Sequence, residues 1–145
     1  MGFVRQIHES VSKVLKRRTA AHDTRPAHLR DGEKAEALAE RHLLARGLTT
    51  IARNLRSRWG EIDLIAADGD TVVFVEVRLR SDARYGGAAA SISAAKQTRL
   101  VRTAESFLAG QGRAYANRPC RFDVILLDRL DARSIEWIRG AFDAF

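Results

Sequence analysis

Two short apolar segments between residues 59 and 80, each with a carboxylate inside it, predict a β-hairpin. Residues 62–65 and 72–77 are rich in β-branched side chains, which favour strands. Asp68-Gly69 between the segments favours a two-residue turn with positive φ. The rest of the chain can be understood as support for this hairpin or as access to it.

The register of the hairpin decides which side chains meet. We expect Ala67 and Asp70 to close the turn. Glu61 then lies opposite Glu76, and Asp63 becomes a diagonal neighbour of Glu76. Because side chains alternate between the two faces of a sheet, the three carboxylates share one face. A slip of one residue would place Asp63 and Glu76 on opposite faces.

A carboxylate within the run Val-Phe-Val-Glu-Val needs a partner, because burying an unpaired charge is costly. For Glu76 this partner is a metal ion, a proton or an arginine, and the sequence offers Arg58, Arg78 and Arg80 nearby. Facing carboxylates repel each other, which favours one shared cation over separate ion pairs. Both interpretations remain open at this point.

Helical periodicity marks two further segments. Residues 31–46 predict a helix that Asp31 caps and Gly47 ends. Glu36 lies at the edge of its apolar stripe, where it is either an ordinary exposed glutamate or able to reach over the sheet.

Residues 91–109 predict the second helix, which ends at Gly110. Lys96 continues its apolar stripe towards the N-terminal end. This lysine either extends along the surface to reach water or points at a site.

Three more strands are expected at residues 48–57, 118–127 and 134–139. The order is helix, three strands, helix, two strands. This order predicts an α/β fold with a mixed central sheet of about five strands flanked by helices. Asp123 lies inside one of these strands and is a weaker fourth acidic candidate.

Length and charge suggest one domain at residues 31–145, preceded by a basic extension at residues 1–30 that is flexible or marginally helical. The extension carries seven Lys and Arg residues against two acids, within a net charge of +7 for the chain. It suits a polyanion such as nucleic acid, or it is a solvated tail. Cys120 is the only cysteine, and no apolar run is long enough to span a membrane. We therefore expect a cytoplasmic protein without a membrane partner.

Arginines and one aromatic residue surround the predicted acidic face. Arg53, Arg56 and Arg58 either contact phosphates or neutralise the acids, and Arg80 follows the second strand of the hairpin. Tyr85, in the loop that follows, either stacks on a base or packs against the protein. These five residues are the candidate nucleic-acid contacts.

Six motifs together resemble the YraN family of small bacterial proteins. This family is related to archaeal Holliday-junction resolvases and to the PD-(D/E)xK superfamily of restriction-endonuclease-like proteins. The motifs are GEKAE at 32–36, RNLR at 53–56, GEIDLI at 60–65, VFVEVR at 73–78, KQ at 96–97 and RFDV at 121–124.

The resemblance implies a restriction-endonuclease-like core and a Mg²⁺-dependent nuclease, with Mn²⁺ as an alternative ion. Asp63 and Glu76 match the two metal-binding acids, and Glu36 matches the acid on the first helix. Arg78 stands where the superfamily has a lysine. Arginine stays protonated and cannot act as a base. Either the metal alone acidifies the attacking water, or Lys96 supplies the missing ammonium.

The family's relatives imply a DNA substrate with branches or other structure, and a homodimer. A second hypothesis is a non-catalytic nucleic-acid-binding or scaffold protein on a nuclease-like fold. A third, weaker hypothesis is an interaction module that uses the basic extension.

Overall fold

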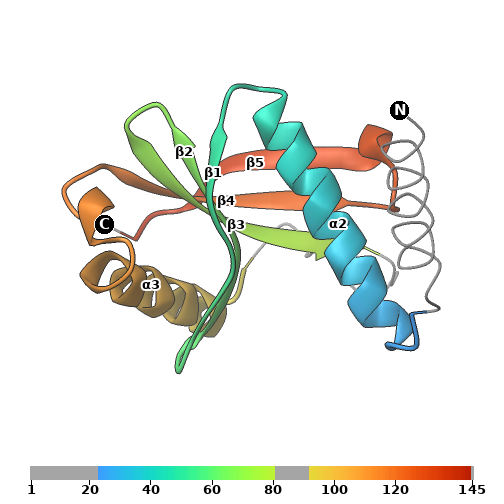
Figure 1. Cartoon of the computed structure of the whole chain (residues 1–145), viewed down its shortest axis with the longest axis horizontal. Coiled ribbons are helices and arrows are strands. Elements are labelled where there is room, and N and C mark those ends of the chain that lie inside the picture. Colours follow the sequence, from blue (N-terminus) through green and yellow to red (C-terminus); the bar gives the residue numbers. More distant parts are fainter. Residues whose placement is uncertain (1–22, 81–91, 145) are drawn as a thin grey trace, which may run out of the picture.

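A five-stranded mixed β-sheet with one helix against each face forms the body of the protein (Figure 1). The computed structural model describes residues 23–80 and 92–144. The main elements are α2 (Ala27–Leu44), β1 (Thr49–Ser57), β2 (Gly60–Asp68), β3 (Thr71–Leu79), α3 (Ala94–Ala109), β4 (Cys120–Leu127) and β5 (Ile135–Phe142). Two short 3₁₀ helices, η3 (Arg113–Tyr115) and η4 (Ala132–Ser134), lie on either side of β4 in the sequence.

The strands follow each other across the sheet in sequence order, β1-β2-β3-β4-β5. Neighbouring strands are antiparallel except β3 and β4, which are parallel and are connected through α3. The expected α/β fold with a mixed sheet of about five strands is confirmed, and it is consistent with a restriction-endonuclease-like core.

Alternating side chains of the central strand β3 enter two separate cores. Phe74 points to the α3 side, where its ring packs edge-on against Phe107 and stacks on Phe122. Val73 and Val75 point to the α2 side and pack with the small buried residues of that helix. Because β3 is buried on both faces, a charged residue on it can reach water only near the end of the strand.

The predicted register of the β2–β3 hairpin is wrong by two residues. Asp68 pairs with Thr71 and Ala67 with Val72, so the loop residues are Gly69 and Asp70. Gly69 supplies the positive φ of the turn, at +57°. A shift of two residues leaves every side chain on its predicted face, since the side-chain period of a strand is two.

Helix α2 begins four residues earlier than the sequence predicted. Pro26 precedes its first residue, and the fixed φ of proline suits that position. Asp31 therefore lies inside the helix and does not cap it. Gly47 follows the helix with φ +90°, as expected of a residue that ends a helix.

The other boundaries differ less. Ser93 caps α3 by accepting a hydrogen bond from the backbone N–H of Lys96, so the helix begins at Ala94. Strand β5 extends to Phe142 and pairs with Phe122, where the sequence predicted a frayed end after Arg139. The predicted N-terminal extension lies largely outside the described residues. No helix in the described parts of the chain is long and apolar enough to cross a membrane.

Candidate functional site

Asp63 and Glu76 lie at the point where the β2–β3 ladder ends. Its last pair is Leu64 with Val75, and the two acids are the next residues of their strands. The Asp63 side chain replaces the ladder there, because its Oδ2 accepts a hydrogen bond from the backbone N–H of Val77 at 2.8 Å. Both acids are buried, with 8% of Asp63 and 9% of Glu76 exposed.

Glu36 reaches this place from α2. It is half-buried, and burial raises the pKa of its carboxyl, as does the negative charge of Glu61. Hydrogen bonds with Asn54 and Asp63 lower the pKa of Glu36 again. Asn54 has φ +50°, a left-handed conformation that asparagine tolerates better than most residues. Asn54 was not among the residues predicted from the sequence, although an asparagine inside a strand pattern is a recognisable signal of such a distortion.

Burial and the neighbouring acids together raise the pKa of Asp63 from the usual 3.8 to about 7. Burial has the largest effect, followed by the negative charge of Glu76. Glu36 and Glu61 raise the pKa of Asp63 further, while the hydrogen bond from Val77 N–H lowers it. The raised pKa of Asp63 thus reflects first its burial and then the carboxylates around it.

Two cations approach Glu76 from different elements. Lys96, in the first turn of α3, places its Nζ 3.0 Å from Glu76 Oε1. Arg78, two residues further along β3, places its Nε 4.0 Å from the same oxygen. Lys96 therefore points at Glu76, while part of its side chain stays exposed. The structure brings together all five residues that were predicted to be catalytic: Glu36, Asp63, Glu76, Arg78 and Lys96.

The oxygen donors of this site fit a hard divalent cation. Among the described residues, no three His, Cys, Asp or Glu side chains form a ready metal-binding group. Mg²⁺, however, is commonly held by one or two carboxylates together with waters and substrate phosphates. Asp63 and Glu76 supply such a pair, and Asp63 has no Lys or Arg within ion-pair distance in the described parts of the chain. An added cation would relieve the repulsion that raises the pKa of Asp63.

Two other acids have different roles. Glu61 pairs with the neighbouring strand residue Arg56 at 3.5 Å, and both side chains are exposed. The sequence made Asp123 a weak candidate for the acidic site, whereas the structure gives it a different role. Its buried carboxylate accepts hydrogen bonds from Arg121 Nε, Trp137 Nε1 and the backbone N–H of Gly140, all within 3.0 Å. The bonds from Trp137 and Gly140 join β4 to β5, and all three explain why this carboxylate can be buried.

Comparison with known proteins places the chain in a family. The model of the "Uncharacterised protein family UPF0102" matches residues 35–127. The chain belongs to this family. The matched segment contains all five residues of the site, and the predicted resemblance to the YraN family is thereby confirmed.

Three UPF0102 proteins illustrate how similar the relatives are. One from Methylobacillus flagellatus is 60% identical over 113 residues, which cover 78% of this chain and 96% of the relative. One from Nitrosomonas europaea is 54% identical over 112 residues, covering 77% and 92%. One from Pseudomonas paraeruginosa is 51% identical over 122 residues, covering 81% and 97%. Their names give the family and no activity.

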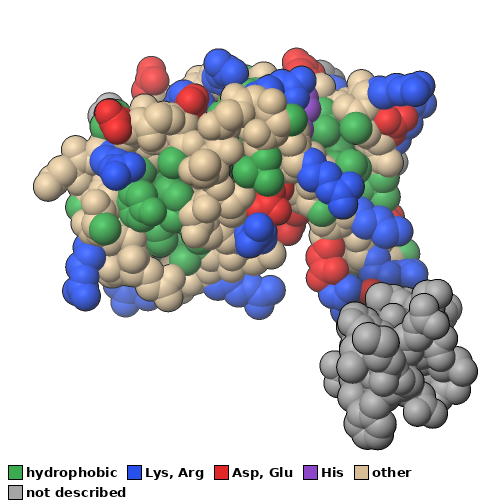
Figure 2. All heavy atoms as spheres, turned by 45° about the horizontal axis from the view of Figure 1, so that its top comes forward, with side chains coloured by type: hydrophobic (Ala, Val, Ile, Leu, Met, Phe, Trp, Pro, Cys, Tyr) green, Lys and Arg blue, Asp and Glu red, His purple; other side chains and the backbone are tan. Residues whose placement is uncertain are grey.

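The arginines predicted to contact nucleic acid are not equivalent in this UPF0102 protein. Arg53 pairs with Glu40 at 2.7 Å, and Arg80 pairs with Asp128 at 2.8 Å and with Glu136 at 3.5 Å. These two arginines neutralise acids away from the site. Figure 2 shows Lys and Arg side chains at many separate places on one face, with carboxylates between them.

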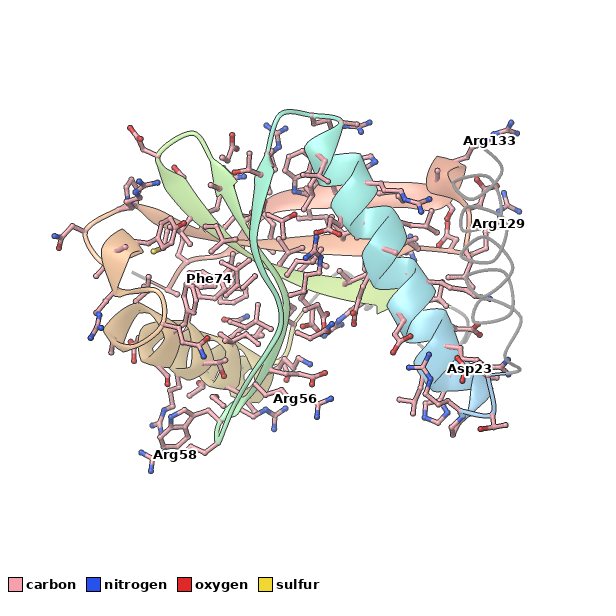
Figure 3. All side chains as sticks on the ribbon, in the orientation of Figure 1. Asp23, Arg56, Arg58, Phe74, Arg129 and Arg133 are labelled. Carbon is pink, nitrogen blue, oxygen red and sulfur yellow. The ribbon has the colours of Figure 1, made fainter. Side chains whose placement is uncertain are left out.

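Arg56 and Arg58 lie at the end of the β1–β2 hairpin, and both are exposed (Figure 3). Arg56 forms an exposed pair with Glu61, and Arg58 stacks on the ring of Trp59. Tyr85, the fifth predicted contact, lies outside the described residues.

Proposed function

We propose that this UPF0102 protein is a metal-dependent nuclease that hydrolyses phosphodiester bonds in DNA. One observation carries the proposal: Asp63 and Glu76 converge at the end of a ladder, and Lys96 arrives beside them from a separate helix. A pair of carboxylates with an adjacent ammonium is the set of groups that metal-assisted phosphoryl chemistry requires. The family resemblance to restriction-endonuclease-like proteins supports the same activity.

In this proposal Asp63 and Glu76 hold Mg²⁺ or Mn²⁺, and Glu36 flanks them from α2. The ion, when bound, would lower the pKa of a water and neutralise charge on the phosphate. The hydrogen bond from Val77 N–H fixes one oxygen of Asp63, which orients the other for ligation. The rigid β2–β3 ladder thereby sets the positions of both acids.

Lys96 and Arg78 act on the phosphate. Arg78 remains protonated at any working pH, so it can bind a phosphate oxygen but cannot remove a proton. Lys96 carries the ammonium that the superfamily places at the position of Arg78. Its Nζ, 3.0 Å from Glu76 Oε1, lies close enough to stabilise negative charge that develops beside the carboxylates.

A second function is a non-catalytic DNA-binding or scaffold role on the same fold. The contact of Lys96 with Glu76 favours it, because an ammonium already compensates one of the two carboxylates. In that case Lys96 is a permanent structural partner and no ion enters. Because the relatives of the family suggest them, we include in the nuclease proposal a preference for branched DNA and a homodimeric state.

Cleavage assays separate the two functions. Junction, flap and linear DNA are incubated with the protein in Mg²⁺, Mn²⁺ or EDTA, beside Asp63→Asn and Glu76→Gln. Asp70→Asn is the matched control, because Asp70 is an exposed acid in the turn at the other end of the same hairpin. The nuclease proposal expects metal-dependent cutting that both site variants lose and the control keeps.

A second measurement does not need the right substrate. Mg²⁺ or Mn²⁺ should raise the melting temperature of the wild type and of Asp70→Asn, since a ligand that binds only the folded state stabilises it. Asp63→Asn and Glu76→Gln should lose this shift. Binding of DNA without cutting on any substrate, together with no metal-dependent shift, would establish the scaffold function instead.

A further inference from the structure

Arginines from two elements meet beside Trp59, at the end of the β1–β2 hairpin. The guanidinium of Arg58 from the hairpin lies 4.6 Å from the centroid of the Trp59 ring. The guanidinium of Arg102 from α3 lies at the same distance from that ring. Arg99, one turn earlier on α3, approaches the adjacent Gly60. We call Arg58, Trp59, Arg99 and Arg102 the hairpin–α3 surface.

The hairpin end is held firmly on α3. Ser57 Oγ accepts a hydrogen bond from the backbone N–H of Trp59 and lies 3.0 Å from Thr103 Oγ1. Thr103 is fully buried and donates its hydroxyl proton to the carbonyl of Arg99. A Cβ placed on Gly60 would lie 3.8 Å from Arg99 Cβ, which shows how closely the two elements approach. The backbone segments that carry the basic groups are therefore fixed relative to each other.

The charges of this surface are not compensated from within the described parts of the chain. Arg58, Arg99 and Arg102 are all exposed, and none has a carboxylate within ion-pair distance there. Arg53 and Arg80 show the contrasting arrangement, since each is paired with acids. The ring of Trp59 attracts the two guanidiniums that lie over it but does not neutralise them. Such a cluster suits an anionic partner.

The surface and the candidate site share helix α3. Lys96, Arg99 and Arg102 follow one another at intervals of three residues on α3. At 1.5 Å per residue, neighbours in this row are about 4.5 Å apart along the helix axis. Each step of three residues also turns by about 60° around the axis, so the three cations follow a curved path along α3. A strand that follows this path from a phosphate at Lys96 would bring its next phosphates towards Arg99 and Arg102.

We propose that the hairpin–α3 surface binds the sugar–phosphate backbone of DNA next to the bond that is cut. This assignment rests on the proposed function for the position of the scissile phosphate. Arg99 and Arg102 contact phosphates beyond the one at Lys96, and Arg58 contacts the strand from the hairpin. Arginine suits this role because its guanidinium binds phosphate oxygens in pairs. The surface sets the direction in which the strand leaves the site.

Binding is measured in EDTA, so that cleavage plays no part. The affinity for labelled duplex, single-stranded DNA and RNA of equal length is followed from low to high NaCl. The variants are Arg99→Ala/Arg102→Ala and Arg58→Ala. The matched control is Arg129→Ala/Arg133→Ala, which removes two exposed arginines at the opposite end of the molecule (Figure 3). Circular dichroism and melting temperature confirm that each variant is folded.

The double variant should bind duplex DNA more weakly, and its log–log salt dependence should be shallower by about 0.9 for each lost phosphate contact. Arg58→Ala should show a smaller change in the same direction, and the control should match the wild type. DNA should also change the tryptophan fluorescence of the wild type. This change should disappear in Trp59→Phe, because Trp137 is the only other tryptophan.

Wild-type affinity and salt slope in the folded double variant would overturn the assignment, as would tighter binding of RNA than of DNA. These outcomes are independent of catalysis. If the double variant loses binding while the wild type never cuts, the hairpin–α3 surface stands as a DNA-binding surface and the nuclease proposal fails. If the wild type cuts and the double variant binds normally, the nuclease proposal stands and this surface is not the path of the strand.

Discussion

Asp63 combines a structural and a chemical role in one side chain. Its Oδ2 closes the hairpin ladder by accepting the Val77 N–H, while its charge is placed among Glu76, Glu36 and Glu61. The hydrogen bond favours the ionised form, and burial and the neighbouring acids favour the protonated form. The second effect is larger, so the pKa of Asp63 rises to about 7. A buried acid held in this way is unfavourable for the metal-free protein.

Asp63→Asn should therefore stabilise the metal-free protein at alkaline pH. Well below pH 3.8, Asp63 is protonated in both the folded and the unfolded state and contributes no difference, and at pH 4 the difference is still small. As pH rises towards 7, the unfolded chain ionises first and the free energy of unfolding falls. Asparagine removes this loss, so the gain should be on the order of 2–4 kcal/mol at pH 8, from about 1.4 kcal/mol per pKa unit.

Urea denaturation in EDTA at pH 4 and at pH 8 measures this difference. Asp70→Asn is again the control and should shift the unfolding free energy little at either pH, because Asp70 is exposed. A stabilisation of equal size at both pH values would show that the charge of Asp63 is not its cause.

Lys96 can be tested by separating metal binding from catalysis. Lys96→Met keeps the length of the side chain and removes the ammonium 3.0 Å from Glu76 Oε1. Mg²⁺ should then bind at least as tightly, because a competing positive charge is gone, whereas cleavage should fall by 10²-fold or more, which is roughly the effect of losing one stabilising group. Calorimetry gives the first quantity and single-turnover cleavage gives the second. Cleavage at the wild-type rate would show that Lys96 is a structural partner of Glu76 and does not act on the phosphate.

At the scale of the elements, the contact between η3 and α3 leaves no space for a side chain. A Cβ on Gly112 would lie 2.2 Å from a ring carbon of Phe107, and Phe107 belongs to the core on the α3 side of the sheet. Glycine is required there to avoid a steric clash and not for its conformation. Gly32, in α2, has open space around its Cβ position.

The same substitution should therefore have opposite effects at these two positions. Gly112→Ala should lower the free energy of unfolding by about 1–3 kcal/mol, because the Phe107 ring must move within a packed core. Gly32→Ala should raise it by about 1 kcal/mol, because alanine favours the helix. Urea denaturation measures both. Destabilisation by Gly32→Ala would indicate a close contact at that position which the structure does not contain.

Local sequence patterns predicted the helices and strands and which faces their side chains take. The features that depend on contacts between distant elements could not be predicted from the sequence. The predicted hairpin placed Asp63 and Glu76 on the same face of the sheet. Only a register error of an odd number of residues would move one of them to the other face, so the error of two residues left this prediction intact. Turn chemistry could not decide between Asp68-Gly69 and Gly69-Asp70, since both pairs suit a two-residue loop.

The partners of the remaining candidates come from other elements. Lys96 and Glu36 stayed ambiguous because their direction depends on how two helices pack on the sheet. Asp123 was overvalued because its partner Trp137 comes from another strand.

At the scale of the whole molecule, three classes of basic residues differ in their use. Some arginines are paired with acids within the domain, as Arg53 and Arg80 are. Others form the hairpin–α3 surface and carry no such partner in the described residues. The third class is residues 1–22, which hold five Lys and Arg residues against one Glu. These residues precede α2 and lie outside the described part of the chain.

Deleting residues 1–22 should show that this third class of basic residues is not needed for metal binding at the candidate site. The cut leaves Arg25 in place, which pairs with Glu33 of α2. The melting-temperature shift caused by Mg²⁺ should be unchanged, because Asp63 and Glu76 remain. Binding of duplex DNA should weaken mainly at low salt, with a shallower salt slope, since a basic segment acts through counterion release. If instead the salt slope is identical in the full chain and the truncated chain, the segment does not contact DNA. We would then infer that it binds another protein.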